Sequence, residues 1–247
     1  MLKQVINMKN KVKKLVSICC LIGVCISIKA QQATVSETLT KVEAYYKTAK
    51  TFNLDVEYAM YKGYTGTYPT ESYKSKIHKK DEITKIDVMG SEIIQFPEVQ
   101  LIINKENKTI NYNKISDNAL QQSPMNVSSF LKFYKEVSSE VSGNTIIHEL
   151  VVKNKQLPIP YNKIILHINK DNYSIKKQVL YLSTKVPFVD ENGINTEDVG
   201  RMVITFKTSS TIVKTPKLQD YVILESNKKP RLAKAYTTYN IIDQSNI

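Results

Sequence analysis

Hydrophobic and polar positions alternate along the chain with two different periods, and the period changes near residue 52. Before that point, apolar residues recur at spacings of four and three, which places them on one stripe of an α-helix. Thr34 and Glu37 have the spacing of a capping box. The pattern therefore predicts an amphipathic helix from about Val35 to Lys50. Its stripe consists of Val35, Leu39, Val42, Tyr46 and Ala49.

From Phe52 to Met60, apolar and polar residues alternate, which is the period of a β-strand with one buried face. Gly63, Gly66 and Pro69 then favour a turn. Further strand-like runs follow at short intervals. Because parallel strands need long crossovers, these strands must pair antiparallel in a meander. The five predicted strands are residues 52–60, 72–79, 83–89, 99–104 and 109–115.

A second apolar stripe at helical spacing follows the polar residues 116–126. It predicts a central helix over about 127–141, which ends at Gly143. After this helix the strand pattern returns, and residues 185–198 are irregular enough to be a surface loop. The second stripe consists of Val127, Phe130, Leu131, Tyr134 and Val137. The later strands are predicted over 145–152, 161–169, 173–182, 199–208, 220–224 and 232–240.

These elements predict an α+β fold. About eleven strands in two meanders must curl or split into layers, and two apolar helix stripes have one natural place to pack. We therefore expect a strongly curved antiparallel sheet, a half-barrel of about eleven strands, with the N-terminal and the central helix packed on its concave face. No repeat, low-complexity tract or linker interrupts residues 31–247, so they are predicted to form a single domain.

The first thirty residues have the pattern of a secretory signal peptide. A basic segment is followed by an unbroken apolar run over residues 15–28 and by the small residue Ala30. The run is shorter than the ~20 residues of a membrane-spanning helix. We expect export to the periplasm or beyond, with cleavage near Ala30 and Gln31. An uncleaved anchor and a lipoprotein stay open as alternatives, since Ile28 is bulky for a cleavage site and cysteines lie in the run.

Composition changes this picture little. The hydrophobic content of 42% and charged content of 23% are those of a globular protein and exclude wholesale disorder. The first thirty residues hold six lysines and no acid, so only +6 of the net charge of +12 belongs to the rest. All three cysteines lie in the apolar run. The remaining chain therefore has no disulfide, thiolate nucleophile or cysteine zinc site.

The residues that carry chemistry form no recognisable catalytic or metal-binding motif. The three histidines, His78, His148 and His167, lack the spacing of a helical zinc motif. There is no glycine-rich phosphate loop and no G-x-S-x-G elbow, and the acids of 190–197 match a calcium loop only in part. The 15 tyrosines suit strands, and an exported protein meets little nucleic acid. We expect no enzyme activity, no cofactor, no metal and no nucleic-acid partner.

The order of elements, a signal peptide, a helix, five strands, a central helix and about six strands, resembles the outer-membrane lipoprotein carrier (LolA-like) superfamily. The resemblance covers nearly all of residues 33–242 and implies the half-barrel fold. It also implies an apolar cavity that holds acyl chains under a helical lid. The chain departs from the family's carriers in having no tryptophan and no early arginine, since its two arginines are Arg201 and Arg231.

Two functions fit these observations. The first is an exported, non-catalytic binding or carrier protein of the cell envelope, a monomer that holds lipid or lipoprotein acyl chains, or another apolar ligand, in a groove. The alternative is an envelope assembly or protein-interaction component that docks other envelope proteins and has a filled core with no ligand cavity. The candidate groove residues are Phe52, Leu54, Val56, Tyr58, Met60, Phe130 and Tyr134.

Overall fold

The computed structural model describes residues 33–115, 128–154, 156, 158–189, 193–211, 213–225 and 229–245, with the backbone alone for residues 128–130. The chain divides into two compact units, Met1–Ala33 and Thr34–Ile247. All the elements below belong to the second unit. The predicted signal peptide, residues 116–126 and Val127 lie outside the described residues.

The predicted N-terminal helix is confirmed as α2 (Val35–Thr48), two residues shorter than expected. Thr34 caps it as the sequence predicts. The backbone N–H of Glu37 donates to Thr34 Oγ1 at 3.3 Å, and the backbone N–H of Thr34 donates to Glu37 Oε2 at 2.8 Å. Helix α2 buries one face. The buried side chains are Val35, Thr38, Leu39, Val42 and Tyr46.

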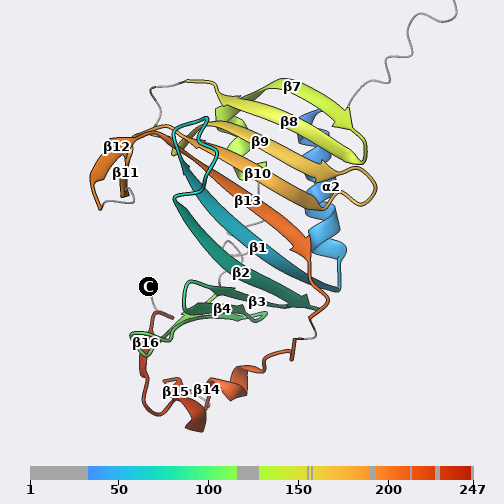
Figure 1. The fold of residues 1–247 in the computed structure, drawn as a ribbon. Helices are drawn as coiled ribbons and strands as arrows, with labels where there is room; N and C mark the ends of the chain where they lie inside the picture. The colour runs from blue at the N-terminus through green and yellow to red at the C-terminus, as the bar shows by residue number, and fades with distance from the viewer. Residues whose placement is uncertain are drawn as a thin grey trace, which may run out of the picture. The chain divides into compact units, whose positions relative to one another are not determined.

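Twelve strands form one open sheet, in the order β16-β6-β5-β4-β3-β2-β1-β13-β10-β9-β8-β7 (Figure 1). Neighbouring strands pair antiparallel except β16 and β6, which are parallel. The pairing of β1 with β13 joins the two predicted meanders. The strands are β1 (Thr51–Lys62), β2 (Glu71–Lys80), β3 (Ile83–Val88), β4 (Ser91–Gln95), β5 (Val99–Asn104), β6 (Thr109–Lys114), β7 (Tyr134–Ser142), β8 (Thr145–Val152), β9 (Tyr161–Asn169), β10 (Ile175–Leu182), β13 (Gly200–Thr208) and β16 (Asn240–Asp243).

The remaining elements are short. The predicted surface loop 185–198 contains a small hairpin of β11 (Val186–Val189) and β12 (Asn195–Asp198). Near the C-terminus, β14 (Val222–Ile223) pairs with β15 (Arg231–Leu232). The strand predicted over 220–224 is thus only two residues long, and the continuous strand predicted over 232–240 is wrong. The 3-10 turns are η2 (Ser128–Phe133), η3 (Leu218–Asp220) and η4 (Lys234–Tyr236).

The predicted central helix is wrong. The chain forms the six-residue η2 and then the strand β7, which pairs with β8 over its whole length. Serine, threonine and valine are weak helix formers, and residues 137–142 contain little else. Pairing with β8 adds backbone hydrogen bonds that a short helix would have to match. The fold is therefore α+β with a curved, mostly antiparallel sheet, but one α-helix among the described residues covers it rather than two.

The sheet carries two hydrophobic cores on opposite faces. We call the face that contacts α2 the inner face and the other the outer face. The first core lies on the inner face, where α2 packs on β1, β2, β8, β9, β10 and β13. The second lies on the outer face of β4, β5 and β6, under the C-terminal segment that contains η3, β14, β15 and η4. Figure 1 shows α2 beside β9, β10 and β13, and β14 and β15 beyond β3 and β4.

The register of the strands fixes this change of face. Paired residues in neighbouring strands point to the same side. Leu54, Ile77 and Ile86 are paired across β1, β2 and β3 and belong to the inner face. Ile94 of β4 pairs with Lys85 and with Leu101, so it lies on the outer face. Strands β4–β6 therefore carry their fully buried side chains on the side away from α2.

Candidate functional site

The inner face of β3–β6 is uncharged. Its twelve side chains are paired in register across the four strands, and each is half-buried. Four are aliphatic and eight are amides or hydroxyls. In a chain with 23% charged residues, this absence is a distinct feature of the surface. The uncharged face consists of Thr84, Ile86, Val88, Ser91, Ile93, Gln95, Gln100, Ile102, Asn104, Thr109, Asn111 and Asn113.

An aliphatic row crosses the middle of this face. We call Ile77, Ile86, Ile93 and Ile102 the isoleucine row, because each is the register partner of the next. Asn111 continues the row on β6, and Ile242 of β16, 45% exposed, ends it. With strands about 4.8 Å apart, the path from Ile77 to Ile242 is about 24 Å along the sheet. The row leads from the core under α2 toward the β16 edge.

Polar side chains line both sides of the isoleucine row. On one side, Gln100 Nε2 donates to Gln95 Oε1 at 3.1 Å, and Gln95 Nε2 donates to the backbone carbonyl of Phe96 at 3.2 Å. On the other side, Ser75 pairs with Val88 and is 3% exposed. Two buried oxygens of this region, Ser75 Oγ and Asn111 Oδ1, have no hydrogen-bond partner. A buried polar atom without a partner is costly, so both atoms favour a ligand or water that completes them.

All charged side chains of β3–β6 lie on the outer face. Lys85 Nζ lies 3.3 Å from Asp87 Oδ1 and 3.2 Å from Glu92 Oε2, and Lys105 Nζ lies 2.6 Å from Glu92 Oε1. Burial by itself raises the pKa of Glu92, but Lys105 and Lys85 outweigh it, so the pKa is lowered overall. On β3–β6 the charged side chains therefore lie at one parity and the twelve side chains of the uncharged face at the other.

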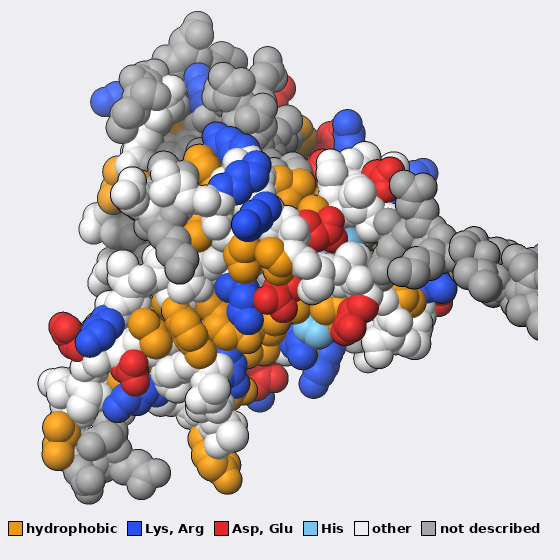
Figure 2. Space-filling model, turned by 90° about the horizontal axis from the view of Figure 1, so that it is seen from above, with side chains coloured by type: hydrophobic (Ala, Val, Ile, Leu, Met, Phe, Trp, Pro, Cys, Tyr) orange, Lys and Arg blue, Asp and Glu red, His pale blue; other side chains and the backbone are white. Residues whose placement is uncertain are grey.

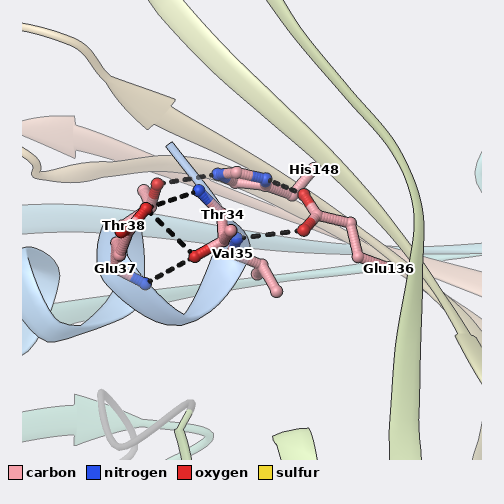
Figure 3. Close-up of polar contacts among 6 residues, drawn as sticks. All are labelled: Thr34, Val35, Glu37, Thr38, Glu136 and His148. Carbon is pink, nitrogen blue, oxygen red and sulfur yellow. Dashed lines mark hydrogen bonds and ion pairs between the residues drawn. The ribbon is translucent and has the colours of Figure 1, made fainter. Parts of the chain in front are cut away.

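Helix α2 is held at its N-terminal end by a buried polar cluster. Figure 3 shows His148 of β8 between Thr38 of α2 and Glu136 of β7. His148 Nδ1 lies 2.6 Å from Glu136 Oε1, and His148 Nε2 lies 3.0 Å from Thr38 Oγ1. The backbone N–H of Val35 donates to the other oxygen of Glu136 at 3.1 Å. These contacts fix the helix against β7 and β8.

The cluster has the composition of a hydroxyl–imidazole–carboxylate relay, but its position excludes catalysis. Thr38 and His148 are both 0% exposed, so no substrate reaches the hydroxyl. The other end of α2 is also anchored. Lys79 Nζ donates to the carbonyl of Tyr46 at 2.7 Å, where a cation complements the C-terminal end of the helix. Helix α2 is therefore a fixed part of the core.

The structure places most of the predicted groove residues in the first core. Leu54, Val56 and Tyr134 are buried there, and Phe52 and Tyr58 pack against it. Tyr134 lies on β7 rather than on a helix, and its hydroxyl donates to the carbonyl of Tyr161 at 2.6 Å. Met60 lies outside this cluster, and the side chain of Phe130 lies outside the described residues.

The outer face has a groove of about 520 Å³ near the turn between β3 and β4. Lysines and acids alternate across its strands, as in the paired series Lys207, Asp55, Lys76 and Asp87. Opposite charges directly across a sheet stabilise each other, so this groove is largely self-neutralising. It shares only Val56 with the predicted groove residues.

Further along the outer face, long side chains shield an apolar row. Ile165, Val179 and Val203 are paired across β9, β10 and β13, and Val179 is only 8% exposed. Lys163 Nζ lies 4.3 Å above the ring of Tyr181 in the adjoining row. Seen from the side of β7 and β8, hydrophobic side chains form a connected area among lysine, arginine and acidic side chains (Figure 2). The aliphatic stems of charged residues commonly cover such rows.

No group of three or more histidine, cysteine, aspartate or glutamate side chains among the described residues is placed to hold a metal ion. No helix in the part of the chain that the structure describes is long and apolar enough to cross a membrane.

Sequence reasoning missed the uncharged face, although the signal was present. Strand β4 was not predicted, so the alternation in residues 91–95 was not connected with that in 99–104 and 109–113. With all four strands aligned, the charged side chains fall at one parity, and the amides together with Ile86, Ile93 and Ile102 fall at the other. Recognising this requires the register, which the turns determine and the residue pattern alone does not.

No protein-family model and no curated protein matches the chain. Solved structures similar to it include an uncharacterized conserved protein from Thermus thermophilus, with TM-score 0.41, 11% identity and coverage of 73% of this chain and 90% of that one. A LolA superfamily protein from Nitrosomonas europaea gives TM-score 0.29, 13% identity and 71% and 92% coverage. The Mycobacterium tuberculosis lipoprotein LppX gives a TM-score of 0.33 and 10% identity, and the match covers 73% of this chain and 99% of that one. The resemblance to LolA-like proteins is thus found again among solved structures, at TM-scores that carry no inference about ligands.

Proposed function

We propose that this chain is an exported, non-catalytic binding protein of the cell envelope that holds a ligand with a long apolar chain along the isoleucine row. The observation that carries the proposal is the continuity of the row. It begins at Ile77 in the core under α2 and passes through Ile86, Ile93 and Ile102, which are half-buried. The apolar ligand predicted from the sequence is kept, but its place moves along the inner face, from the core under α2 to β3–β6.

The composition of the row suits an extended chain better than a compact apolar ligand. Side chains two positions apart on a strand are about 7 Å apart, so the single row is narrow. On β3–β6 all of the side chains next to it except Val88 are amides or hydroxyls, which keep a ligand on the centre line. Each buried methylene contributes about 0.8 kcal/mol, so a chain that follows several strands gains enough to offset the cost of ordering it.

The test is binding of a fluorescent long-chain acyl probe to the purified chain after lipid removal. The double variant Ile93→Thr with Ile102→Thr keeps β-branched residues in both strands while making the row polar. Loss of about 1–2 kcal/mol at each position corresponds to a combined weakening of about 30-fold or more. Val137→Thr with Val141→Thr is the matched control, because both valines are exposed on the edge strand β7.

Saturable binding by the wild type and the control, with weakened binding by the row variant, supports the proposal. Equal affinity in all three proteins would place the probe elsewhere and refute it. No binding by the wild type would also refute it and would favour the envelope assembly component with a filled core. Circular dichroism of each variant separates a binding defect from unfolding.

A further inference from the structure

The uncharged face restricts the polar end of the ligand as well as its chain. This inference rests on the proposed function, because it concerns the same site. A ligand with one long apolar chain usually carries a polar group at one end, and that group must be solvated or paired wherever it lies. The side chains that can pair it are those beside the isoleucine row, and none of those on β3–β6 is charged.

Among the described residues of strands β2–β6, no lysine or arginine of the inner face is available to an anionic group. Lys79 of β2 pairs with Thr84 and is the lysine of strands β2–β6 that lies on this face. Its Nζ already donates to the carbonyl of Tyr46 at 2.7 Å, and burial lowers its pKa. Lys85 and Lys114 of the same strands lie on the outer face. A carboxylate or phosphate buried beside the row would lose hydration without gaining a partner, which is strongly unfavourable.

Two buried oxygen atoms without hydrogen-bond partners favour a neutral group rather than an anion. Asn111 Oδ1 stands in line with the isoleucine row, is buried and accepts no hydrogen bond. An amide oxygen is an acceptor only, so its missing partner must be a donor, either O–H or N–H. Ser75 Oγ, at 3% exposure, is likewise without a partner and can donate or accept. A hydroxyl or an amide N–H satisfies Asn111 Oδ1 without bringing a charge, whereas Ser75 Oγ lies four strands away on β2 and needs a separate partner.

We infer that the ligand is a neutral single-chain amphiphile whose polar end carries a hydrogen-bond donor, as in a monoacylglycerol, a fatty alcohol or an N-acyl amide. Asn111 receives that donor at the β6 end of the isoleucine row, and the chain runs back toward Ile77. The site therefore discriminates against free fatty acids and lysophospholipids with the same chain.

The experiment compares four ligands of one chain length as competitors of the fluorescent acyl probe at pH 8: a monoacylglycerol, the fatty acid methyl ester, the free fatty acid and a lysophospholipid. The methyl ester is neutral without a donor, so it separates charge from hydrogen bonding. We expect the monoacylglycerol to compete at least about 10-fold more strongly than the carboxylate, with the ester between them, as expected for unpaired charge and a missing donor.

Variants at Asn111 give an independent measurement. Asn111→Asp keeps the shape and adds a charge, and we expect it to weaken monoacylglycerol competition by about 10-fold. Asn111→Leu removes the acceptor, so the advantage of the monoacylglycerol over the methyl ester should disappear. Asn107→Asp, in the exposed turn between β5 and β6, adds the same charge away from the row and is the control.

The outcomes separate the two proposals. Equal competition by fatty acid and monoacylglycerol would overturn the neutral headgroup while leaving the acyl-binding row intact. Equal competition by ester and monoacylglycerol in the wild type would overturn the role of Asn111 Oδ1. Failure of the wild type to bind the acyl probe would overturn the proposed function, and this inference with it.

Discussion

Replacing Thr38 by Val should destabilise the protein through a single lost hydrogen bond. Valine has nearly the shape of threonine, so packing of α2 against β8 is preserved. The change leaves His148 Nε2, now 3.0 Å from Thr38 Oγ1, without any partner. Both residues are 0% exposed, so water does not replace the hydroxyl.

The magnitude follows from this burial. An unsatisfied buried polar atom costs about 1–3 kcal/mol. For a unit of this size, each kcal/mol lowers the melting temperature by about 2–4 °C. Taking about 2 kcal/mol, Thr38→Val should lower the melting temperature by about 4–8 °C. Thermal unfolding followed by circular dichroism measures it, with urea titration as a check on the free energy of unfolding.

A double-mutant cycle with His148→Leu tests the cause. Removing both partners eliminates the unpaired nitrogen, so Thr38→Val should cost much less in the His148→Leu background than in the wild type. Thr40→Val is the control, since Thr40 is exposed on the same helix. Equal cost of Thr38→Val in both backgrounds would show that the hydroxyl does not act through His148, and the account of how α2 is held would fail.

Three further predictions concern pH, the end of α2 and the second core. Burial and Lys80 with Lys85 lower the pKa of His78, and burial with Lys177 lowers that of His167. The unfolded chain therefore binds protons more readily below about pH 6.5, and the free energy of unfolding should fall as the pH drops from 6.5 toward 5. The double variant His78→Gln with His167→Gln should flatten this pH dependence in urea titrations. An unchanged pH dependence in the variant would contradict the prediction. Lys79→Met should lower the free energy of unfolding by about 0.5–1 kcal/mol, because it removes the cation at the C-terminus of α2, whereas Lys80→Met should not. Equal melting temperatures of the two variants would show that Lys79 does not stabilise this end of the helix. Val222→Ala should lower the free energy of unfolding by about 2–3 kcal/mol because the residue is fully buried. Ile223→Ala, at the neighbouring exposed residue, should lower it little. A small effect of Val222→Ala would mean that the C-terminal segment is not part of a core.

Local patterns were enough to predict much of the fold. The capping box at Thr34 and the stripe of Val35 to Tyr46 identify α2, and strict alternation identifies strands such as β5, β8 and β9 at their observed bounds. These signals depend on neighbouring residues only. They succeed where propensity, pattern and tertiary packing agree.

The errors arise where distant partners decide the structure. The spacing of Phe130, Leu131 and Tyr134 is helical, yet pairing with β8 makes 134–142 a strand. The patterns of 220–224 and 232–240 predict two strands, but apolar side chains of these segments instead cover the outer face of β4–β6. The candidate site was missed for the same reason, since the isoleucine row exists only once β3–β6 are in register.

The two cores on opposite faces make completion of the fold depend on residues 200–243. Strand β1 finds its second partner only when β13, which begins at Gly200, is available. Strand β6 finds its second partner only in β16 (Asn240–Asp243), and the second core is complete only with Val222. Contacts between such distant segments form slowly. During synthesis, neither core can therefore be completed until residues 200–243 have been made.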